Sequence, residues 1–596
     1  MGSKQNLRII IPIIIILLTS QLLLAQSIPV ELVKNSEGNW QLLRDGESYY
    51  IMGAGGAGSK KLLAEAGANT FRTWGVDEQL EAELDEAYEL GLAVVVGHWL
   101  GHPRHGFDYS DTEAVAEQFS RVRRDVLKYK DHPAVLIWGI GNEMEGFAQG
   151  DDPAVWAHVQ ALAAMIKELD PNHPTMTVTA EIGGKRVEMI NQLCPDIDIM
   201  GINSYGGVPS LFERYNKLGG NKPFIITEFG PPGVWEIAKT EYGAPPELTS
   251  TQKADFYQAG YEKGYLDNDL CLGSFAFTWG SKLEVTPSWY GMFLASGEKL
   301  ASVDVMTELW SGCKPENLCP GIRSFELVGS DIVEAGTELE VKLDVVDPEG
   351  AEIRVDWVIC SEPSEYLIAD QTQWVPLPLD NIITSSSSSG AILSIPGAGV
   401  YRIYVTAYDD SGAAATANVP IMVEGEPAEL QFKFPLAVYS DSFPQPWASS
   451  GWMGSHEALT IETEYQVLPQ SGDACMKIYC KAPFGWVGVA WQNPANDWGD
   501  LAGGYNLSGA KKLTFWAKGE MGNELIDFGV GLLNSDKKFY DSGKAELKNV
   551  KLKKEWKKYT INLKGKDLSR IKTPFYWISE GSNHSMAFYL DDIYFE

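Results

Sequence analysis

Short apolar runs alternate with amphipathic stretches through the first half of the chain. The runs are apolar on both faces, which is typical of parallel strands covered on both sides. The segments between them, such as DEQLEAELDEAYELG at 77–91, carry apolar residues at helical spacing. Eight strand-then-helix units in about 250 residues predict a closed (β/α)8 barrel, a TIM barrel, over residues 28–313. The predicted strands are YYIMGAGG, TFRTWG, LAVVVGHW, AVLIWGIGNE, TMTVTAE, IDIMGINSY, FIITEFG and LGSFAFTWG.

Three further segments flank this barrel. Residues 30–50 predict a hairpin that turns at 36–39 and closes the bottom of the barrel. Residues 321–425 contain short alternating segments with turns between them, which predict a β-sandwich. Residues 430–596 are β-rich and dense in aromatics, which predicts a two-sheet jelly roll. The chain is therefore predicted to be multidomain.

Both C-terminal segments resemble known modules. VDPEG, VDW and GVYRIYVTAYDDSG resemble immunoglobulin-like modules related to the polycystic-kidney-disease (PKD) repeat. YNLSGAKKLTFWAKG and the closing LDDIYF resemble carbohydrate-binding modules of galactose-binding-like fold. Such resemblances predict folds and say little about function.

The N-terminus has the layout of a signal peptide over residues 1–25. Lys4 and Arg8 precede the apolar run IIIPIIIILL, and small residues follow near Ala25. A retained membrane anchor is the alternative, but the apolar run is shorter than a bilayer span. No cysteine follows the run, so a lipid anchor is not indicated. We expect a secreted or periplasmic protein without stable membrane insertion after signal removal.

Charge and cysteine content narrow the possible partners. A net charge of −32 repels nucleic acid and, weakly, disfavours uronate-rich or sulfated substrates. Cys313 and Cys319 flank KPENL in an apparent linker, and export permits oxidation, so we expect a disulfide between them. No Cys/His spacing predicts a zinc site, and we expect no catalytic cofactor.

Polar and aromatic residues follow the predicted strands. In a TIM barrel these strand ends meet at one rim, where sites form. The residues at the rim are Arg72, Trp74, His98, Asn142, Glu143, Asn203, Tyr205, Glu228 and Trp279. Glycoside cleavage needs one carboxyl that protonates the leaving oxygen and a second that attacks or activates water. Glu143 and Glu228 end the fourth and seventh strands, which lie across the barrel mouth, so they could form such a pair.

GNE after the fourth strand and TEFG at the seventh resemble the clan A glycoside hydrolases, the superfamily of families 2, 5 and 17. The resemblance covers residues 48–310. It implies that Glu143 is the acid/base and Glu228 the nucleophile of a retaining reaction, with their carboxyl groups about 5–5.5 Å apart.

The resemblance also assigns binding roles. Asn142 would bind the sugar 2-hydroxyl, Arg72 and Tyr205 would keep Glu228 ionised, and Trp279 would stack under the sugar. The other residues expected to contact substrate are Trp74, His98 and Asn203.

Several rim residues have other interpretations. Glu145 and Glu181 also lie near strand ends, and Glu145 is the replacement acid if Glu143 is not catalytic. His98 with His102 and His105 could suggest a metal, but no matching carboxylate spacing accompanies them, so we predict no metal in the barrel.

In the last domain, Asp591 and Asp592 could complete a structural calcium site. Four tryptophans there could stack on sugar or could be core residues. They are Trp452, Trp486, Trp491 and Trp498.

The sequence thus predicts an exported retaining glycoside hydrolase that takes a polysaccharide or oligosaccharide. The long aromatic loop SKLEVTPSWYGMFLASGE suits a groove for a polymer. A neutral β-glucan, especially a β-1,3-glucan, is the first candidate, because the chain loosely resembles laminarinase-like members of the clan. The alternatives are a β-mannanase, a β-galactosidase, a transglycosylase and a non-catalytic glycan-binding or adhesion protein.

Overall fold

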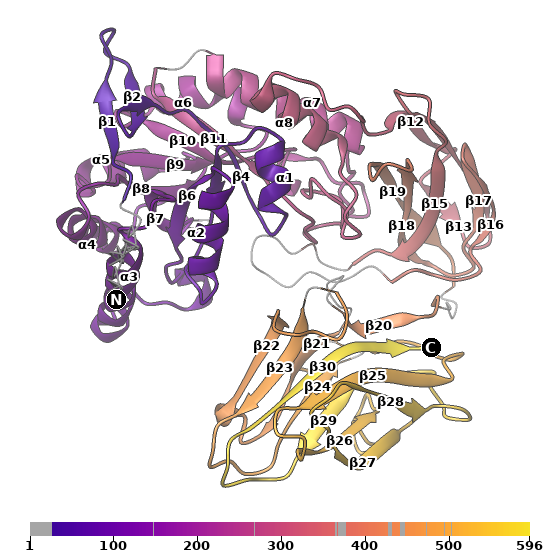
Figure 1. Cartoon of the computed structure of the whole chain (residues 1–596). Helices are drawn as coiled ribbons and strands as arrows, with labels where there is room; N and C mark the ends of the chain where they lie inside the picture. The colour runs from indigo at the N-terminus through magenta and orange to yellow at the C-terminus, as the bar shows by residue number, and fades with distance from the viewer. Residues whose placement is uncertain are drawn as a thin grey trace, which may run out of the picture.

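A computed structural model describes most of the chain (Figure 1). The described residues are 27–146, 148–266, 269–363, 366, 377–426, 432–440, 447–472, 474–493, 495–501 and 503–596. The predicted signal peptide, residues 1–25, lies outside them. Within them, no helix is long and apolar enough to cross a membrane.

The predicted closed parallel barrel is confirmed. Its strands pair in chain order, and the last pairs with the first. The strands are β4 (Ile51–Gly55), β5 (Thr70–Arg72), β6 (Ala93–His98), β7 (Val135–Asn142), β8 (Thr175–Ala180), β9 (Ile199–Asn203), β10 (Phe224–Phe229) and β11 (Cys271–Phe277). All eight predicted runs therefore become strands, and their carboxyl ends meet at one rim.

Helices follow the strands and form the outer layer of the barrel (Figure 1). They are α1 (Lys60–Glu65), α2 (Leu80–Glu89), α3 (Thr112–Tyr129), α4 (Pro153–Leu169), α5 (Arg186–Leu193), α6 (Leu211–Lys217), α7 (Ser250–Leu266) and α8 (Ala301–Ser311). The starts of two helices are encoded locally. Asp111 and Asp152 accept hydrogen bonds from the first free amides of α3 and α4.

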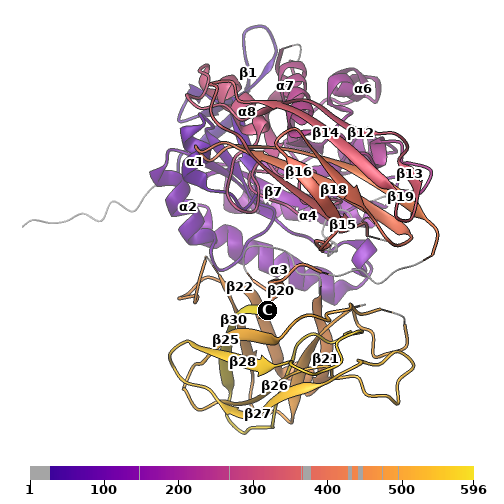
Figure 2. The same cartoon turned by 90° about the vertical axis from the view of Figure 1, so that its right-hand side faces the viewer.

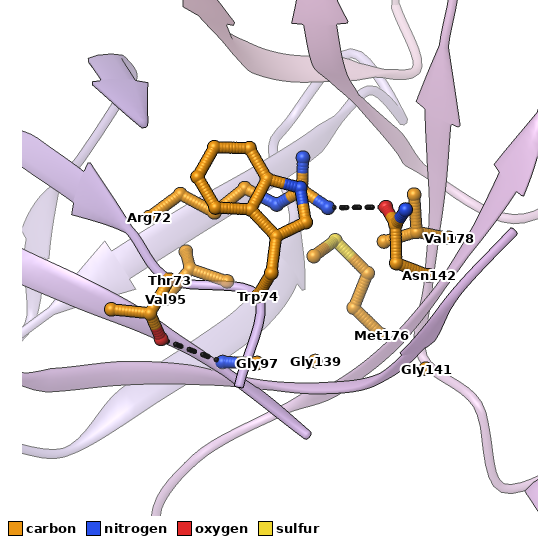
Figure 3. Close-up of a pocket in the computed structure, with 10 residues that line it drawn as sticks. All are labelled: Arg72, Thr73, Trp74, Val95, Gly97, Gly139, Gly141, Asn142, Met176 and Val178. Atoms are coloured by element: carbon orange, nitrogen blue, oxygen red, sulfur yellow. Dashed lines mark hydrogen bonds between the residues drawn. The ribbon is translucent and has the colours of Figure 1, made fainter. Parts of the chain in front are cut away.

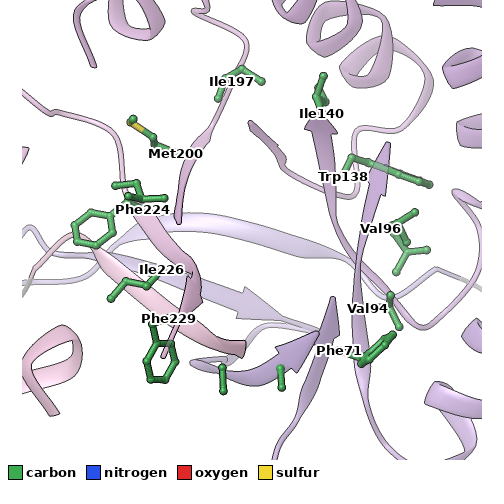
Figure 4. Packing of buried hydrophobic residues seen from close by; sticks show 14 of the residues in the cluster. Phe71, Val94, Val96, Trp138, Ile140, Ile197, Met200, Phe224, Ile226 and Phe229 are labelled. Carbon is green, nitrogen blue, oxygen red and sulfur yellow. The ribbon is translucent and has the colours of Figure 1, made fainter. Parts of the chain in front are cut away.

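Two apolar layers hold the barrel together. Alternate side chains of the strands face outward and pack under the helices; Val94, Val96 and Trp138 are examples (Figure 4). The intervening side chains fill the barrel interior, where Val95 and Phe275 are fully buried. This division follows from the two-residue repeat of a strand.

A small sheet closes the bottom of the barrel, as the sequence predicted. It consists of β1 (Val30–Lys34), β2 (Trp40–Arg44) and β3 (Glu47–Ser48). Val30 and Leu42 belong to the same apolar cluster as the interior of the barrel. The rim where the carboxyl ends of the strands meet is therefore at the opposite end.

A β-sandwich of two four-stranded sheets follows the barrel. Figure 2 looks onto it, with the barrel behind. Its strands are β12 (Gly321–Val328), β13 (Ile332–Glu334), β14 (Glu338–Val346), β15 (Arg354–Ser361), β16 (Ile383–Ser387), β17 (Gly390–Ser394), β18 (Gly399–Tyr408) and β19 (Ala414–Glu424).

Strand β19 is covered on both faces. Ala415, Ala417 and Ile421 pack in the sandwich core. The opposite face meets the barrel, where Asn418 Nδ2 donates to Glu247 Oε2 at 2.6 Å. The sandwich is thus attached to the barrel along a strand face as well as through the chain.

The last domain contains two antiparallel sheets, one of six and one of five strands. The strands are β20 (Leu436–Tyr439), β21 (Ala448–Gly454), β22 (Leu459–Tyr465), β23 (Cys475–Cys480), β24 (Val487–Gln492), β25 (Lys512–Gly519), β26 (Leu525–Val530), β27 (Ala545–Lys551), β28 (Lys557–Asn562), β29 (Tyr576–Ser579) and β30 (Met586–Phe595).

The four candidate tryptophans of this domain separate into two groups. Trp491 is buried in the core, and Trp498 is half-buried. Trp452 and Trp486 are 38% and 53% exposed. These two are the most exposed of the four, so they are the stronger candidates for the predicted sugar-binding role.

The predicted disulfide between Cys313 and Cys319 is wrong in this structure, where both thiols are free. Cys313 is exposed just after α8. Cys319 is buried, and its Sγ donates to the Lys299 carbonyl at 3.4 Å. The linker therefore buries the Cys319 thiol and leaves the Cys313 thiol in solvent.

Candidate active site

The carboxylate of Glu228, on β10, accepts three hydrogen bonds from side chains of other strand ends. Oε1 accepts from Arg72 Nη1 at 3.0 Å and from Trp74 Nε1 at 2.8 Å, and Oε2 accepts from Tyr205 Oη at 2.9 Å. Each bond favours the ionised carboxylate. Arg72 and Tyr205 thus hold the contacts that the sequence predicted, and Trp74 adds one that it did not.

Arg72 is buried and connects the two motifs. Its Nη1 also donates to the Thr227 carbonyl at 2.7 Å, and its Nη2 donates to Asn142 Oδ1 at 2.7 Å (Figure 3). Burial lowers the pKa of Arg72, while the charge of Glu228 opposes that shift. Arg72 belongs to β5 and donates to residues of β7 and β10, so its guanidinium fixes the relative positions of these three strands.

Glu143 lies beside this group in a different environment. Its Oε1 accepts one hydrogen bond, from Asn203 Nδ2 at 2.7 Å. Burial, followed by the charge of Glu228, raises the pKa of Glu143 to about 7, and the Asn203 bond opposes the rise. Glu143 is therefore suited to carry a proton near neutral pH, beside a second carboxylate that accepts three hydrogen bonds.

The backbone at Glu143 is in the left-handed region, with a φ of 52°. Gly141, two residues earlier, has a φ of 74°, and a Cβ there would clash with Met144 Sδ. A glutamate in this conformation costs about 1–2 kcal/mol. Such strain concentrates at functional sites, and here it falls on the residue whose carboxylate accepts from Asn203.

Aromatic rings form a wall beside Glu228, and we use "aromatic wall" for Trp74, Tyr205, Phe277 and Tyr290. The Phe277 ring lies 6.0 Å from Trp74, 5.9 Å from Tyr205 and 5.6 Å from Tyr290, measured between centroids. Tyr205 and Tyr290 are 5.4 Å apart. The aromatic wall includes Trp74 and Tyr205, the two aromatic side chains that donate hydrogen bonds to Glu228.

Trp235, which the sequence analysis did not single out, lies at the outer edge of this wall. Its centroid is 5.8 Å from that of Tyr205, and its side chain is 57% exposed. An exposed indole beside an active carboxylate suits the apolar face of a pyranose. Its only signal in the sequence is its position shortly after the seventh strand, in GPPGVWE.

The prediction that Trp279 stacks under the sugar is wrong. Trp279 is fully buried, its Nε1 donates to the Ser59 carbonyl at 3.0 Å, and its ring packs on Phe293. The strand ends at Phe277, so the alternation that would aim residue 279 at the lumen no longer applies. Phe277 is the aromatic residue that β11 contributes to the site.

The prediction that His98 contacts substrate is also wrong. On β6 it shares the outward face with Val94 and Val96, and its ring stacks on Trp138 with centroids 5.5 Å apart. Burial and the charge of Arg121 lower the pKa of His98 to about 3, so the ring is neutral. It belongs to the packing between the strands and the helices.

The two other acids near the rim have structural partners. Glu145 Oε1 accepts from Arg186 Nε at 2.7 Å and from the Ala180 amide at 2.8 Å. Glu181 forms two hydrogen bonds with Arg214, at 2.7 and 3.1 Å. Neither carboxylate forms a hydrogen bond with Asn203, Arg72 or Tyr205 among the hydrogen bonds of the described residues, so Glu143 stays the better candidate acid.

The candidate calcium residues contact a neighbouring loop. Asp591 accepts from the Gln470 amide at 2.9 Å, and Asp592 accepts from Ser471 Oγ at 2.7 Å. Burial raises the pKa of Asp591 to about 6. Within the described residues no group of three or more His, Cys, Asp or Glu could hold a metal. Calcium at this pair stays a prediction.

Two glutamates, in GNE and TEFG, lie at the ends of β7 and β10 of a closed parallel barrel, which is the arrangement that the resemblance to the clan A glycoside hydrolases implies. Comparison with known proteins agrees. Residues 63–273 match the family described as "Glycosyl hydrolases family 2, TIM barrel domain".

The most similar curated proteins include two mammalian β-glucuronidases. The rat enzyme, from Rattus norvegicus, is 27% identical over 44% of this chain and 43% of its own length. The pig enzyme, from Sus scrofa, is 29% identical over 28% of this chain and 26% of its own. The chain thus spans less than half the length of the curated relatives it matches.

A solved β-glucuronidase from an uncultured Clostridium sp. aligns with 17% identity and a TM-score of 0.38. The alignment covers 48% of this chain and 54% of that one.

Proposed function

We propose that this protein is a retaining β-glycosidase that acts by double displacement. The observation that supports it most is that the two glutamates lie in different environments. Glu228 accepts three hydrogen bonds that favour its ionised form, and Glu143 has a pKa of about 7. A nucleophile and a proton donor are therefore present together at neutral pH.

In the first step, Glu228 attacks the anomeric carbon while Glu143 protonates the leaving oxygen. The covalent glycosyl-enzyme forms as the aglycone departs. In the second step, Glu143, now ionised, takes a proton from water, and that water releases the sugar with its configuration retained. Asn142 Oδ1 accepts from Arg72, which leaves the amide nitrogen of Asn142 to bind a sugar hydroxyl.

Two candidate sugars are compared first, and both have a pyranose face that an aromatic ring can stack on. A β-glucan fits the exposed Trp235 and the aromatic wall. A β-glucuronide is the second candidate, because the curated relatives are β-glucuronidases. Lys282, 5.2 Å from the Phe277 ring centroid, is a cation that could meet a uronate. Its Nζ is 3.3 Å from Glu284 Oε2, so a uronate would have to displace that pairing.

A substrate panel tests both the reaction and the sugar. The panel holds β-1,3-glucan, β-1,4-glucan and β-mannan oligosaccharides, with aryl β-glucoside, β-galactoside and β-glucuronide. We expect turnover on a β-glucan, with the β-anomer as the first product in proton NMR. Faster turnover of the glucuronide would favour the second sugar. Absence of turnover on every substrate would favour a binding or adhesion protein.

The pH dependence follows from Glu143. As the general acid it must be protonated, and its pKa is raised to about 7, so kcat/KM should be sustained below that pH and fall as pH rises through it. Asn203→Ala removes the hydrogen bond that lowers the pKa. The basic limb of the kcat/KM profile should then move up by about one pH unit. A limb that stays in place would contradict the role of Glu143.

We further infer that the protein is exported, on the charged and apolar pattern of residues 1–25. The exposed Trp452 and Trp486 support a glycan-binding role for the jelly roll.

A further inference from the structure

A buried polar network joins the sandwich to the barrel. We use "interface network" for Glu247, Lys253, Thr286, Ser288 and Asn418. Glu247 forms an ion pair with Lys253. It also accepts from Thr286 Oγ1 at 2.6 Å, from Ser288 Oγ at 2.8 Å and from Asn418 Nδ2 at 2.6 Å. One carboxylate therefore connects the barrel, its loop after β11 and the sandwich.

The sandwich side of this network is itself fixed. Asn418, on β19, accepts from Arg402 Nη1 at 2.7 Å through Oδ1. Arg402, on β18, is fully buried, pairs with Glu362 and donates to the Pro245 carbonyl at 3.0 Å. The Asn418 amide is therefore held with its nitrogen toward Glu247, because its oxygen faces a guanidinium.

The barrel side leads to the active site. Thr286 and Ser288 belong to residues 278–300, which we name the β11–α8 loop. Lys253 Nζ donates to the Ser288 carbonyl at 2.5 Å, and Trp289 Nε1 donates to the Pro232 carbonyl at 3.0 Å. The next residue, Tyr290, is fully buried and packs on Tyr205. Ser288, which donates to Glu247, is therefore separated from Tyr290 of the aromatic wall by a single residue.

The interface network and the adjoining Arg402–Glu362 pair hold their charges away from water, each cation beside an anion. The side chains of Glu247, Lys253, Arg402 and Glu362 are 1%, 6%, 0% and 2% exposed. Burial raises the pKa of Glu247, but Lys253 and the hydrogen bonds outweigh it and lower the net pKa. Loss of a partner from such a group is costly, so the loop stays in the position the network specifies.

We propose that Asn418 and Arg402 of the sandwich are positioning residues for the glycosidase reaction. Through Glu247 they fix the β11–α8 loop, so that Tyr290 holds Tyr205 against Glu228. The inference rests on the proposed function and extends it, because it makes the sandwich a part of the catalytic unit. The link to the nucleophile is the Tyr205 hydrogen bond of 2.9 Å.

The test uses the full chain with three variants. Asn418→Ala removes the sandwich contact, and Thr286→Val removes a loop contact without changing the sandwich. Val341→Ala is the matched control, because Val341 is fully buried in the sandwich core away from the network. Each is compared with wild type in kcat, KM, the pH profile and the melting temperature.

We expect kcat to fall about 10- to 100-fold in Asn418→Ala and less in Thr286→Val, because small displacements of an active group are costly. The acid limb of kcat/KM should move to higher pH in both, because a carboxylate that loses a hydrogen bond is protonated more readily. Val341→Ala should lower the melting temperature and leave kcat and the acid limb unchanged. The inference is overturned if Asn418→Ala keeps the wild-type acid limb, or if Val341→Ala shifts it equally.

Amide hydrogen exchange separates this inference from the proposed function. Exchange in residues 281–290 should quicken in Asn418→Ala and not in Val341→Ala, whether or not a substrate is found. Unchanged exchange in Asn418→Ala would overturn the positioning role. Faster exchange in a protein that cleaves no glycoside would sustain the network's hold on the loop and reject the glycosidase.

Discussion

Glu228→Gln should fold as the wild type does and lose nearly all turnover. A neutral amide cannot attack the anomeric carbon, so no glycosyl-enzyme forms. We expect kcat/KM to fall on the order of 10⁴-fold, or about 5 kcal/mol of transition-state stabilisation. The glutamine oxygen can still accept from Arg72 and Trp74, and its amide nitrogen can donate to Tyr205 Oη, so melting temperature and circular dichroism should change little.

Glu181→Gln is the matched control for that variant. Glu181 also lies past a barrel strand, and its hydrogen bonds with Arg214 place it outside the proposed machinery. It should keep most of its turnover. A Glu228→Gln enzyme that keeps activity near the wild-type rate, or a control that loses as much, would show that Glu228 is not the nucleophile.

Glu143→Ala should separate the two chemical steps. Without a proton donor, a natural glycan with a poor leaving group cannot depart, and its turnover should fall on the order of 10³-fold. An activated aryl glycoside needs no proton to leave, so its glycosyl-enzyme should still form and should accumulate as a burst. Azide needs no general base, so adding it should restore turnover and yield a glycosyl azide of retained configuration.

The stereochemistry of the azide product identifies each glutamate. Glu228→Ala leaves a space where the nucleophile stood, and azide entering it attacks from that face and gives inversion. Proton NMR of the products distinguishes the two outcomes. A retained azide from Glu228→Ala, or an inverted one from Glu143→Ala, would mean that the roles are exchanged.

The barrel could be predicted from the sequence because its signal is local and repeated. Wholly apolar runs alternate with segments whose apolar residues have helical spacing, and eight such units predict a closed parallel barrel. The strand ends of that barrel meet at one rim. Arg72, Asn142, Asn203 and Tyr205 were found by this rule, and all four lie in the hydrogen-bonded group around the two glutamates.

The remaining side chains depend on geometry that the strand rule does not contain. His98 ends a strand but occupies its outward face, which only the register of the barrel reveals. Trp279 lies two residues past the end of β11, where the chain has turned away, and Phe277 takes its expected place. The predicted disulfide failed for a similar reason, since spacing in a linker does not say that Cys319 is turned inward.

The double burial of β19 has a consequence for how such a chain can evolve. A module joined only by a flexible tether can be exchanged or lost by recombination without changing its neighbour. Here one strand contributes Ala417 to its own core and Asn418 to the barrel, so a replacement sandwich would have to reproduce both faces at once. Barrel and sandwich are thus expected to be inherited as one unit, and substitutions at their contact are expected to arise in compensating pairs.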